Sequence, residues 1–556
     1  MKKYIILFAM ILSFSSLQAQ VNKEVEVTKA YIPTVSKAVK PVLEAQIVDT
    51  AYINPDVDYS ITPLSISTQL QTQPIKPATV TYWEFNKPAM AQVKVGAGYP
   101  LNSLLQAYCS THNASVGYLA AKVDHFGYYS DIKNVYGSSI DATQISNNVA
   151  VAAGLYIAGR TLSTDVCYSG NIYHNYAFEQ TLSSFINNQS IGASVGYGDN
   201  FVDLSRFNYR VNLDYSHFYN SRSNIDDGVE IDALFGQEIG LGKLLFSLGY
   251  ESISSDNMYQ NNNASFAFSI DNNISGWVLS VGGQYYFDQT STEFDDTPHH
   301  YVIPKLSIKR ADASSLSLFA DIGGSIEQNS YSKLAAINPY IGDGVANQSS
   351  VEYNFIGGVE GQLASSSLNY RLYCNYAIWV NNRYWALRVI DEPSDVDNGI
   401  YYSSFDLSLA NLNTMSFNLD LNYKPFSNLA LAADVHYYSY NESSSIEYIN
   451  SNPDFEISLG ADYTLRKLKV GVNGHILGER RFTVLNFSDS SNLTSTTSTM
   501  TLKSSFDLSA YAQWQASDSL SVFIEGGNLC SANLYPWPYY RGFGAQITAG
   551  VKINFK

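Results

Sequence analysis

Few residues in this sequence have the types and spacing that chemistry requires. Eight histidines are present, and only His299 and His300 are adjacent, shortly after Asp295 and Asp296. A metal site needs three or four His, Cys or carboxylate ligands at short spacings, and no such group occurs. We interpret the His pair as part of a polar loop, and we expect no metal and no cofactor.

Acidic residues gather in short polar stretches. The formal net charge is −17, and carboxylates cluster at Asp226–Asp227 and Asp391–Asp397. Asp395 and Asp397 before Gly399 resemble the start of a calcium loop, but the remaining ligand spacing is missing. We interpret the stretches as solvated loops; divalent cations bridging them to lipid phosphates are the alternative. Nucleic acid is excluded as a partner because phosphate binding needs a basic patch.

The elements that must carry any site are strands. After the N-terminus no apolar run approaches the roughly 18 residues that a membrane helix requires. The last stretch, Phe543–Phe555, alternates strictly between apolar and polar residues, which predicts a half-buried strand. Its apolar face carries Ile547, Val551, Ile553 and Phe555. Such a terminal strand is what closes the seam of an outer-membrane barrel.

Turn lengths predict the number of strands. From about Ala91 onward, short turns such as Ile239–Gly242 alternate with long ones such as Glu327–Ser349. Outer-membrane barrels have short periplasmic turns and long outer loops. When Leu368–Ile390 and Tyr401–Tyr423 are each taken as one tall strand, the alternation holds and predicts an all-β, antiparallel transmembrane barrel of about 22 strands.

Aromatic residues support this barrel. They make up 14% of the chain, and amphipathic rings are enriched where a barrel wall meets the two membrane interfaces. Strands predicted to run outward end in rings, which we interpret as an outer girdle: Tyr128, Tyr129, Tyr173, Tyr176, Tyr215, Phe218, Tyr219, Tyr285, Tyr286, Phe287, Tyr437, Tyr438 and Tyr440.

The alternation also assigns an inner face. The residues of Arg206–Tyr215 alternate between apolar and polar or charged types. The apolar residues would face lipid. The charged residues would face a water-filled lumen, because a charge at mid-bilayer depth costs about 2–4 kcal/mol on the lipid face. Four histidines fall on predicted strands: His125, His217, His436 and His475. Polar residues on strands are ordinary in a barrel lumen, so we expect no enzyme. The residues expected to line the lumen are Arg206, Arg210, Asp214, Asp420, Lys469 and Lys552.

The N-terminal part differs from the rest. Residues 1–19 have a basic start, an apolar core and small residues before Ala19, which predicts a secretory signal peptide. Residues 20–90 hold seven of the 16 prolines, and proline lacks the N–H that a sheet ladder needs. We therefore predict an extended segment, periplasmic or lumen-filling, over 20–90 and a barrel over 91–556.

We expect no disulfide bond among the four cysteines. Cys109, Cys167, Cys374 and Cys530 fall on predicted strands that are not neighbours, which bars disulfides across the wall. We expect free thiols.

The C-terminal residues resemble a known family. Asn528-Leu529, the run Tyr535-Pro-Trp537-Pro, Gly542 and the final Phe555 are similar to the last hairpin of TonB-dependent receptors. Two N-terminal runs, Val25–Tyr31 and Asp58–Pro63, resemble a group of Bacteroidetes outer-membrane barrels. The resemblance implies a 22-stranded barrel and solute uptake driven from the inner membrane.

The chain departs from that family before residue 91. A receptor of the family carries a folded plug, and a proline-rich segment of this length cannot form one, so we predict a plug-less version. Glu24–Tyr31 could add to a sheet edge of TonB. A plain extended linker is the interpretation we favour, and contact with TonB stays open.

Together these features predict a function. We expect a porin-like or receptor-like transporter in the outer membrane of a Gram-negative bacterium, surrounded by lipid and lipopolysaccharide. Since about 22 strands leave a lumen too wide for side chains to fill, the N-terminal segment, inward loops or a partner must block it. The alternative is a non-transporting structural or assembly component that binds envelope proteins through its N-terminal segment or outer loops.

Overall fold

The computed structural model describes most of the predicted barrel. The described residues are 90–555 without 114, 135–136, 178–183, 257–258, 293–295, 311–314, 343–347, 364–366, 391–402, 443–448 and 488–494. The predicted signal peptide over 1–19, the segment over 20–90 apart from Met90, and the acidic stretch Asp391–Asp397 lie outside the described residues.

Strands make up nearly all of the described chain, together with one short helix. In chain order these elements are β1 (Ala91–Tyr99), β2 (Asn102–Asn113), β3 (Gly117–Tyr128), β4 (Asp131–Lys133), β5 (Ser139–Asp141), β6 (Gln144–Ile157), β7 (Arg160–Asn175), β8 (Ser184–Gly198), β9 (Asn208–Asn220), β10 (Ile225–Ile239), β11 (Gly242–Ser255), β12 (Tyr259–Ile274), β13 (Trp277–Thr292), β14 (Pro298–Arg310), β15 (Ser317–Glu327), α2 (Tyr331–Ile337), β16 (Ser350–Leu363), β17 (Leu368–Ile390), β18 (Ser403–Phe426), β19 (Leu429–Glu442), β20 (Phe455–Leu465), β21 (Leu468–Leu477), β22 (Arg480–Phe487), β23 (Ser495–Leu502), β24 (Ser505–Gln515), β25 (Leu520–Gly527) and β26 (Gln546–Phe555). Within the described ranges, none of the helical structure has the length and apolar character needed to cross a membrane.

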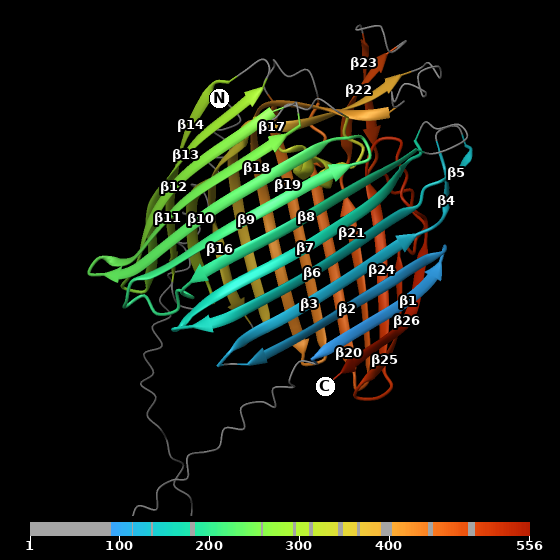
Figure 1. Cartoon of the computed structure of the whole chain (residues 1–556). Coiled ribbons are helices and arrows are strands. Elements are labelled where there is room, and N and C mark those ends of the chain that lie inside the picture. Colours follow the sequence, from blue (N-terminus) through green and yellow to red (C-terminus); the bar gives the residue numbers. More distant parts are fainter. Residues whose placement is uncertain are drawn as a thin grey trace, which may run out of the picture. The chain divides into compact units, whose positions relative to one another are not determined.

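The strands close into a ring (Figure 1). Each strand of the ring pairs antiparallel with its neighbours, and β26 pairs with both β25 and β1, with Val551 opposite Val95 across the seam. Of the 24 strands in this sheet, β22 and β23 form a hairpin outside the ring, so 22 strands close it. The predicted all-β fold and strand number are confirmed.

The two ends of the ring differ as the turn lengths predicted. At one end lie the first residue of β1, the last of β26 and tight turns such as that between β10 and β11. At the other end lie the long connections, two of which carry the β4–β5 and β22–β23 hairpins (Figure 1). We call the second end the outer end, because short turns are periplasmic in outer-membrane barrels.

The wall has an apolar outer face. On β9, Val211, Leu213 and Tyr215 are 42%, 48% and 44% exposed, whereas Asn212 and Asp214 between them are half-buried. Since successive side chains of a strand point to opposite faces, the apolar set faces outward and the polar set inward. This is the wall of a barrel that crosses a membrane with strands.

Several boundaries differ from the sequence-based expectation. His299 and His300, expected in a loop, belong to β14 and pair with Asp288 and Phe287 of β13. Asp226 and Asp227, also expected in a loop, belong to β10. In each case the ladder continues past the apolar part of the strands, so polar residues at the outer end still find partners.

The last and ninth strands also begin later than expected. Residues 543–545 precede β26, since the Asn528 side-chain amide donates to the Phe543 carbonyl at 3.0 Å and holds it in the preceding loop. Arg206 precedes β9, in the turn after β8. There it pairs with Asp199 at 3.3 Å.

Candidate functional site

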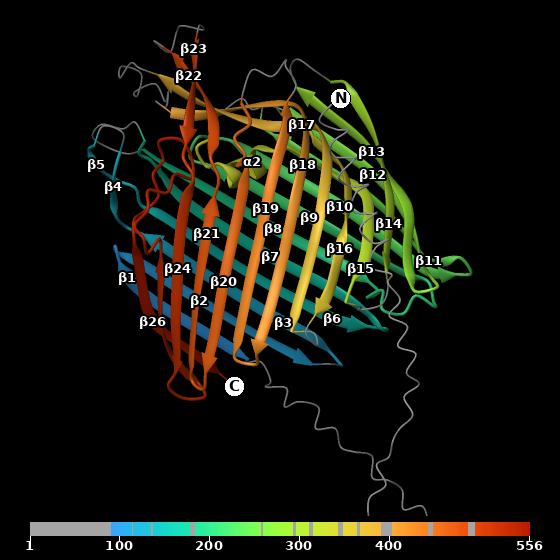
Figure 2. The same cartoon turned by 180° about the vertical axis from the view of Figure 1, so that it is seen from behind.

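The loop between β15 and β16 folds into the barrel. It carries α2, which lies inside the ring of strands near the outer end (Figure 2). The helix begins where the Ser330 side chain accepts a hydrogen bond from the Lys333 N–H, a normal N-cap. Leu334 and Ala335 are buried. A loop with buried apolar residues is packed against the wall rather than extended into solvent.

Polar contacts hold α2 against β10, β11 and β12. The Ser332 N–H donates to Asp226 Oδ2 at 2.7 Å, and the Tyr331 N–H donates to Tyr259 Oη at 2.8 Å. The Tyr259 hydroxyl in turn donates to Asp226 at 3.2 Å. Asp226 is only 3% exposed, so its carboxylate binds the loop away from water, where charge-assisted hydrogen bonds are strongest.

An aromatic cluster lies beside this loop. The rings of Tyr340 and Tyr540 stack with centroids 3.7 Å apart, and Trp537 contacts Phe405 at 5.1 Å and Trp385 at 5.5 Å. We define the aromatic cluster as Tyr176, Tyr340, Trp385, Phe405, Phe482, Trp537 and Tyr540.

The aromatic cluster spans the outer mouth. Tyr176 follows the fifth strand of the ring, Trp385 lies on the fifteenth, and Tyr540 lies between the last two. Residues anchored so far apart around a ring can meet only across its opening. The aromatic cluster therefore joins loops from distant parts of the ring across the outer mouth.

Burial in the aromatic cluster affects its tyrosines. Burial, together with the neighbouring Tyr176 and Tyr540 phenols, raises the pKa of Tyr340 well above its usual value. Burial likewise raises the pKa of Tyr176. Both phenols stay neutral at physiological pH, as a closed apolar contact requires.

The predicted outer girdle divides into two sets. Tyr215 and Tyr437 are 44% and 52% exposed and face outward, whereas Tyr176 and Phe218 are 2% and 7% exposed and pack inward. Phe218 lies 6.1 Å from the Tyr331 ring of α2. Strand alternation alone would have separated these sets, but only the inward loops explain what the second set contacts.

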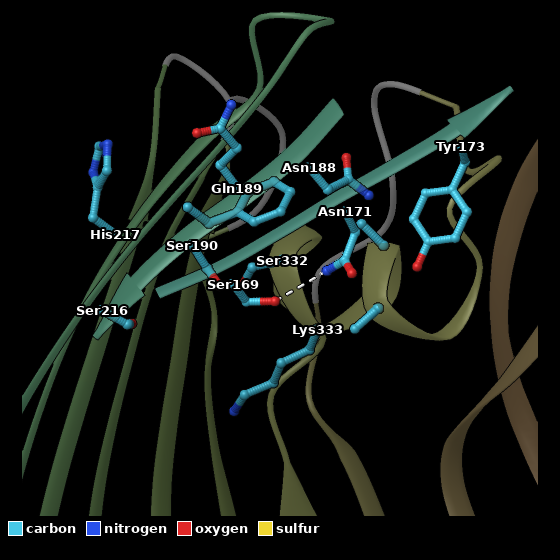
Figure 3. A pocket seen from close by; sticks show the side chains of 13 residues that line it. Ser169, Asn171, Tyr173, Asn188, Gln189, Ser190, Ser216, His217, Ser332 and Lys333 are labelled. Atoms are coloured by element: carbon cyan, nitrogen blue, oxygen red, sulfur yellow. Dashed lines mark hydrogen bonds between the residues drawn. The ribbon is translucent and has the colours of Figure 1, made fainter. Parts of the chain in front are cut away.

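A pocket separates α2 from the inner faces of β7, β8 and β9 (Figure 3). Its volume is about 370 Å³. The polar groups that face it are hydroxyls and amides: Ser169, Asn171, Asn188, Ser190, Ser216 and Ser332. Tyr173, Phe218 and two alanines of α2 supply apolar surface. His217 and Gln189 border the pocket through their backbone, and their side chains lie on the other side of the strands (Figure 3).

Two features define the pocket chemically. Among the described residues that line it, Lys333 is the one charged side chain on the inner side of the wall, and its ammonium donates to Glu251 at 3.1 Å. The Asn188 side chain is 6% exposed, and among the described residues its Oδ1 has no hydrogen-bond partner. The pocket thus combines a compensated charge with a buried acceptor that a bound molecule could satisfy.

The residues predicted to line the lumen fall on different parts of the wall. Arg210 and Asp214 lie on β9, with Asp214 opposite Glu230 of β10. Asp420 lies on β18, opposite Arg371 and Asp434. Lys469 lies on β21, 5.5 Å from the Tyr511 ring centroid. Lys552 lies on β26 opposite Lys94. The structure does not gather them into one site.

Other candidates are resolved by their positions. Gly192-Ala193-Ser194-Val195-Gly196 has the spacing of a nucleophile elbow, but it lies within β8 and Ser194 donates to Asp165. An elbow needs a strand-to-helix turn. Across the described ranges, no group of three or more His, Cys, Asp or Glu side chains could hold a metal ion. The four cysteines are free.

Comparisons with known proteins agree on architecture. No protein-family model and no curated protein sequence matches the chain. Among solved structures, the FrpB iron transporter from Neisseria meningitidis matches at 9% identity and a TM-score of 0.63, over 84% of this chain and 82% of that one. The pyoverdine outer membrane receptor FpvA from Pseudomonas aeruginosa PAO1 matches at 12% identity and a TM-score of 0.63, over 84% and 79%. The copper transporter OprC matches at 11% identity and a TM-score of 0.58, over 84% and 80%.

At these identities the likeness concerns the fold. The chain has the 22-stranded barrel of outer-membrane receptors and transporters. The predicted resemblance to TonB-dependent receptors is confirmed for the barrel architecture.

Proposed function

We propose that this protein is a receptor-like outer-membrane transporter whose outer entrance is closed by its own loops. The observation that carries the proposal is the aromatic cluster, which joins distant parts of the ring over a polar lumen. A ring of this size is too wide for wall side chains to fill, so a closure is what separates a regulated transporter from an open pore. The role of the lumen is then passage rather than catalysis.

Polar residues of the inner wall would form the path. Arg210, Asp214, Asp420, Lys469 and Lys552 are proposed to line it, with Arg206 at the periplasmic entrance. Strand alternation supports this assignment, because each of the five lies at an inward position of its strand. The outer wall would contact lipid and lipopolysaccharide.

The N-terminal segment completes the proposal. Residues 20–90 are rich in proline, which disfavours a folded plug, so we infer a plug-less barrel of the Bacteroidetes type. The segment would block the lumen from the periplasmic side or bind a periplasmic partner, with TonB as one candidate.

The pocket under α2 suggests the class of solute. Its hydroxyls, amides and aromatic surface suit a small neutral molecule with several hydroxyl groups, and its volume is within the range of about 300–1,000 Å³ for ligand sites. A charged solute would find no free opposite charge among the lining residues, because Lys333 is bound by Glu251.

Conductance tests the closure. Single-channel recording in planar bilayers would compare the wild type with three variants: deletion of 331–341 with a Gly-Ser bridge, deletion of 21–85, and both. We expect no stable open channel in the wild type and the largest conductance when both barriers are removed. A double deletion that folds and does not conduct would refute the transport role.

Binding tests the pocket independently of conductance. Calorimetry with glucose and maltose would compare the wild type with Asn188→Leu and with Gln189→Leu. Because Gln189 faces the other side of the strand (Figure 3), we expect at least tenfold weaker binding for Asn188→Leu only. Equal binding by both variants would rule out the pocket as the solute site.

One observation favours the alternative of an assembly component. The β22–β23 hairpin extends from the outer end (Figure 1), and β23 pairs with β22 alone among the described strands. Its sequence, Ser-Thr-Thr-Ser-Thr-Met-Thr-Leu, has none of the charges or prolines that usually protect a free edge. Purification in mild detergent distinguishes the two roles: stoichiometric partners that are lost when 488–502 is deleted would support assembly.

A further inference from the structure

A hydrogen-bonded set of polar residues lies on the lipid-facing wall near the outer end. Ser103 is the second residue of β2, His125 lies near the end of β3, and Asn147 lies near the start of β6. In the sheet these positions are neighbours. His125 pairs with Asn147, and Ser103 pairs with Gly127, which lies two residues after His125. Three strands thus bring together residues that are well separated in the sequence.

The set faces outward. Val149 and Leu119, which share the alternation of Asn147 and His125 on their strands, are 39% and 50% exposed. On β2, Asn102 is buried and accepts from inward-facing Thr548, so its neighbour Ser103 points to the opposite face. Tyr129, 36% exposed, belongs to the outward set of rings and marks the level of the interface.

The hydrogen bonds have the order of a catalytic triad. His125 Nε2 lies 2.8 Å from Ser103 Oγ, and His125 Nδ1 lies 2.7 Å from Asn147 Oδ1. An amide oxygen can only accept, so Nδ1 must carry the proton and Nε2 is left free to accept from the serine hydroxyl. Nucleophile, base and orienting group are therefore in the geometry that activates a serine.

A donor for the developing negative charge is also present. The Tyr129 hydroxyl lies 3.2 Å from Ser103 Oγ, and its ring folds over Gly127, where a side chain would collide with it. A hydroxyl this close to the attacking oxygen can donate to an oxyanion formed on the carbonyl that the serine attacks.

We propose that Ser103, His125 and Asn147 form a serine hydrolase site for acyl esters of lipids in the outer leaflet. Ester groups lie at the boundary between headgroups and acyl chains, the level at which this set meets the apolar wall. The proposal goes beyond transport and is independent of it. It departs from the expectation that the chain is not an enzyme, which considered histidines only as lumen residues.

The reaction balances with water as the second substrate. His125 takes the proton of Ser103 as Oγ bonds to the acyl carbon, then gives it to the leaving alcohol as the ester bond breaks. In the second half His125 takes a proton from water as the water oxygen bonds to the acyl carbon. The bond between this carbon and Oγ then breaks, His125 returns the proton to Oγ, and a fatty acid is released. Tyr129 donates to the carbonyl oxygen in both halves, and Asn147 holds the imidazole.

The experiment uses the full-length protein in detergent micelles. Fatty acid release would be measured from phosphatidylethanolamine in one arm and from lipid A in the other. A fluorophosphonate probe and peptide mass spectrometry would identify the reactive serine. We expect release from at least one lipid, an adduct on Ser103, and at least a hundredfold loss in Ser103→Ala and His125→Asn. Ser110→Ala on the same strand serves as the control and should keep full activity.

Two results would overturn the proposal. One is no release above background from either lipid with a wild-type barrel shown to be folded by its heat-dependent gel mobility. The other is release that persists in Ser103→Ala. A smaller loss in Asn147→Ala than in His125→Asn, with an altered pH profile, would identify Asn147 as the positioning residue.

Discussion

Tyr340 and Tyr540 stack face to face, with ring centroids 3.7 Å apart and planes 20° apart. The first comes from the loop that carries α2 and the second from the loop that leads into β26. This contact joins the inward loop to the strand that closes the barrel seam. A movement of one loop that the other does not follow must therefore separate the two rings.

Tyr540→Ala should open the outer mouth. Loss of a large buried aromatic side chain costs about 3–5 kcal/mol, and each 1.4 kcal/mol is a tenfold change in an equilibrium. The open population should rise by at least a hundredfold, measured as open probability in planar bilayers. Tyr540→Phe keeps the stack and removes the hydroxyl that donates to Asn175, so it should open far less. Equal opening in both variants would mean that the stack does not hold the closure.

Asp226→Asn should release α2. The carboxylate accepts the Ser332 N–H at 2.7 Å, and a hydrogen bond to a charged group is worth about 1.5–3 kcal/mol. Hydrogen exchange over 331–337 should accelerate roughly ten- to hundredfold. Asp227→Asn is the matched control, because Asp227 faces outward and binds Tyr215 and His217. Equal acceleration in the control would show a general loss of stability rather than a released latch.

The sequence was sufficient to predict the barrel and insufficient to predict how its loops meet. Alternation in β9 and β26 is local, since each residue's face follows from its neighbours in the chain. The stack of Tyr340 on Tyr540 depends on where two loops meet across the ring, and nothing in either loop's pattern encodes that meeting. The sequence does not predict the set of Ser103, His125 and Asn147 for the same reason, because only the strand register brings these residues together.

The sequence predicted strand boundaries wrongly where polar side chains form hydrogen bonds with the backbone of another element. Asp226 looked like a loop residue because it is acidic, yet it lies in a strand and is buried by α2. Phe543 belongs to the alternating pattern, yet its carbonyl accepts a hydrogen bond from the Asn528 side-chain amide and it lies in the loop before β26. Composition alone does not reveal such contacts between a side chain and a distant element.

Substitutions on β9 should separate the two faces of the wall. Leu213→Arg places a charge on the lipid side near the middle of the strand, at a cost of about 2–4 kcal/mol. Asn212→Arg places the same charge on the inner side, where water is available, and should change stability by less than about 1 kcal/mol. Urea titration of folding into liposomes, followed by gel mobility, measures both. A larger loss for Asn212→Arg would reverse the assignment of the faces.

Alkaline pH should weaken the closure through Tyr340. Burial and its phenol neighbours raise the pKa of Tyr340 in the folded chain, so the folded state holds the proton more tightly than the unfolded state does. Its contribution is fully present below the ordinary tyrosine pKa of about 10 and is lost as pH rises beyond it. Open probability should therefore stay constant to about pH 9 and rise above about pH 10. Tyr340→Phe keeps the stack, has no proton to lose, and should shrink this rise to the part that other buried or partly buried tyrosines such as Tyr176 and Tyr173 contribute. A rise that begins near neutral pH in both proteins would assign the effect to another group.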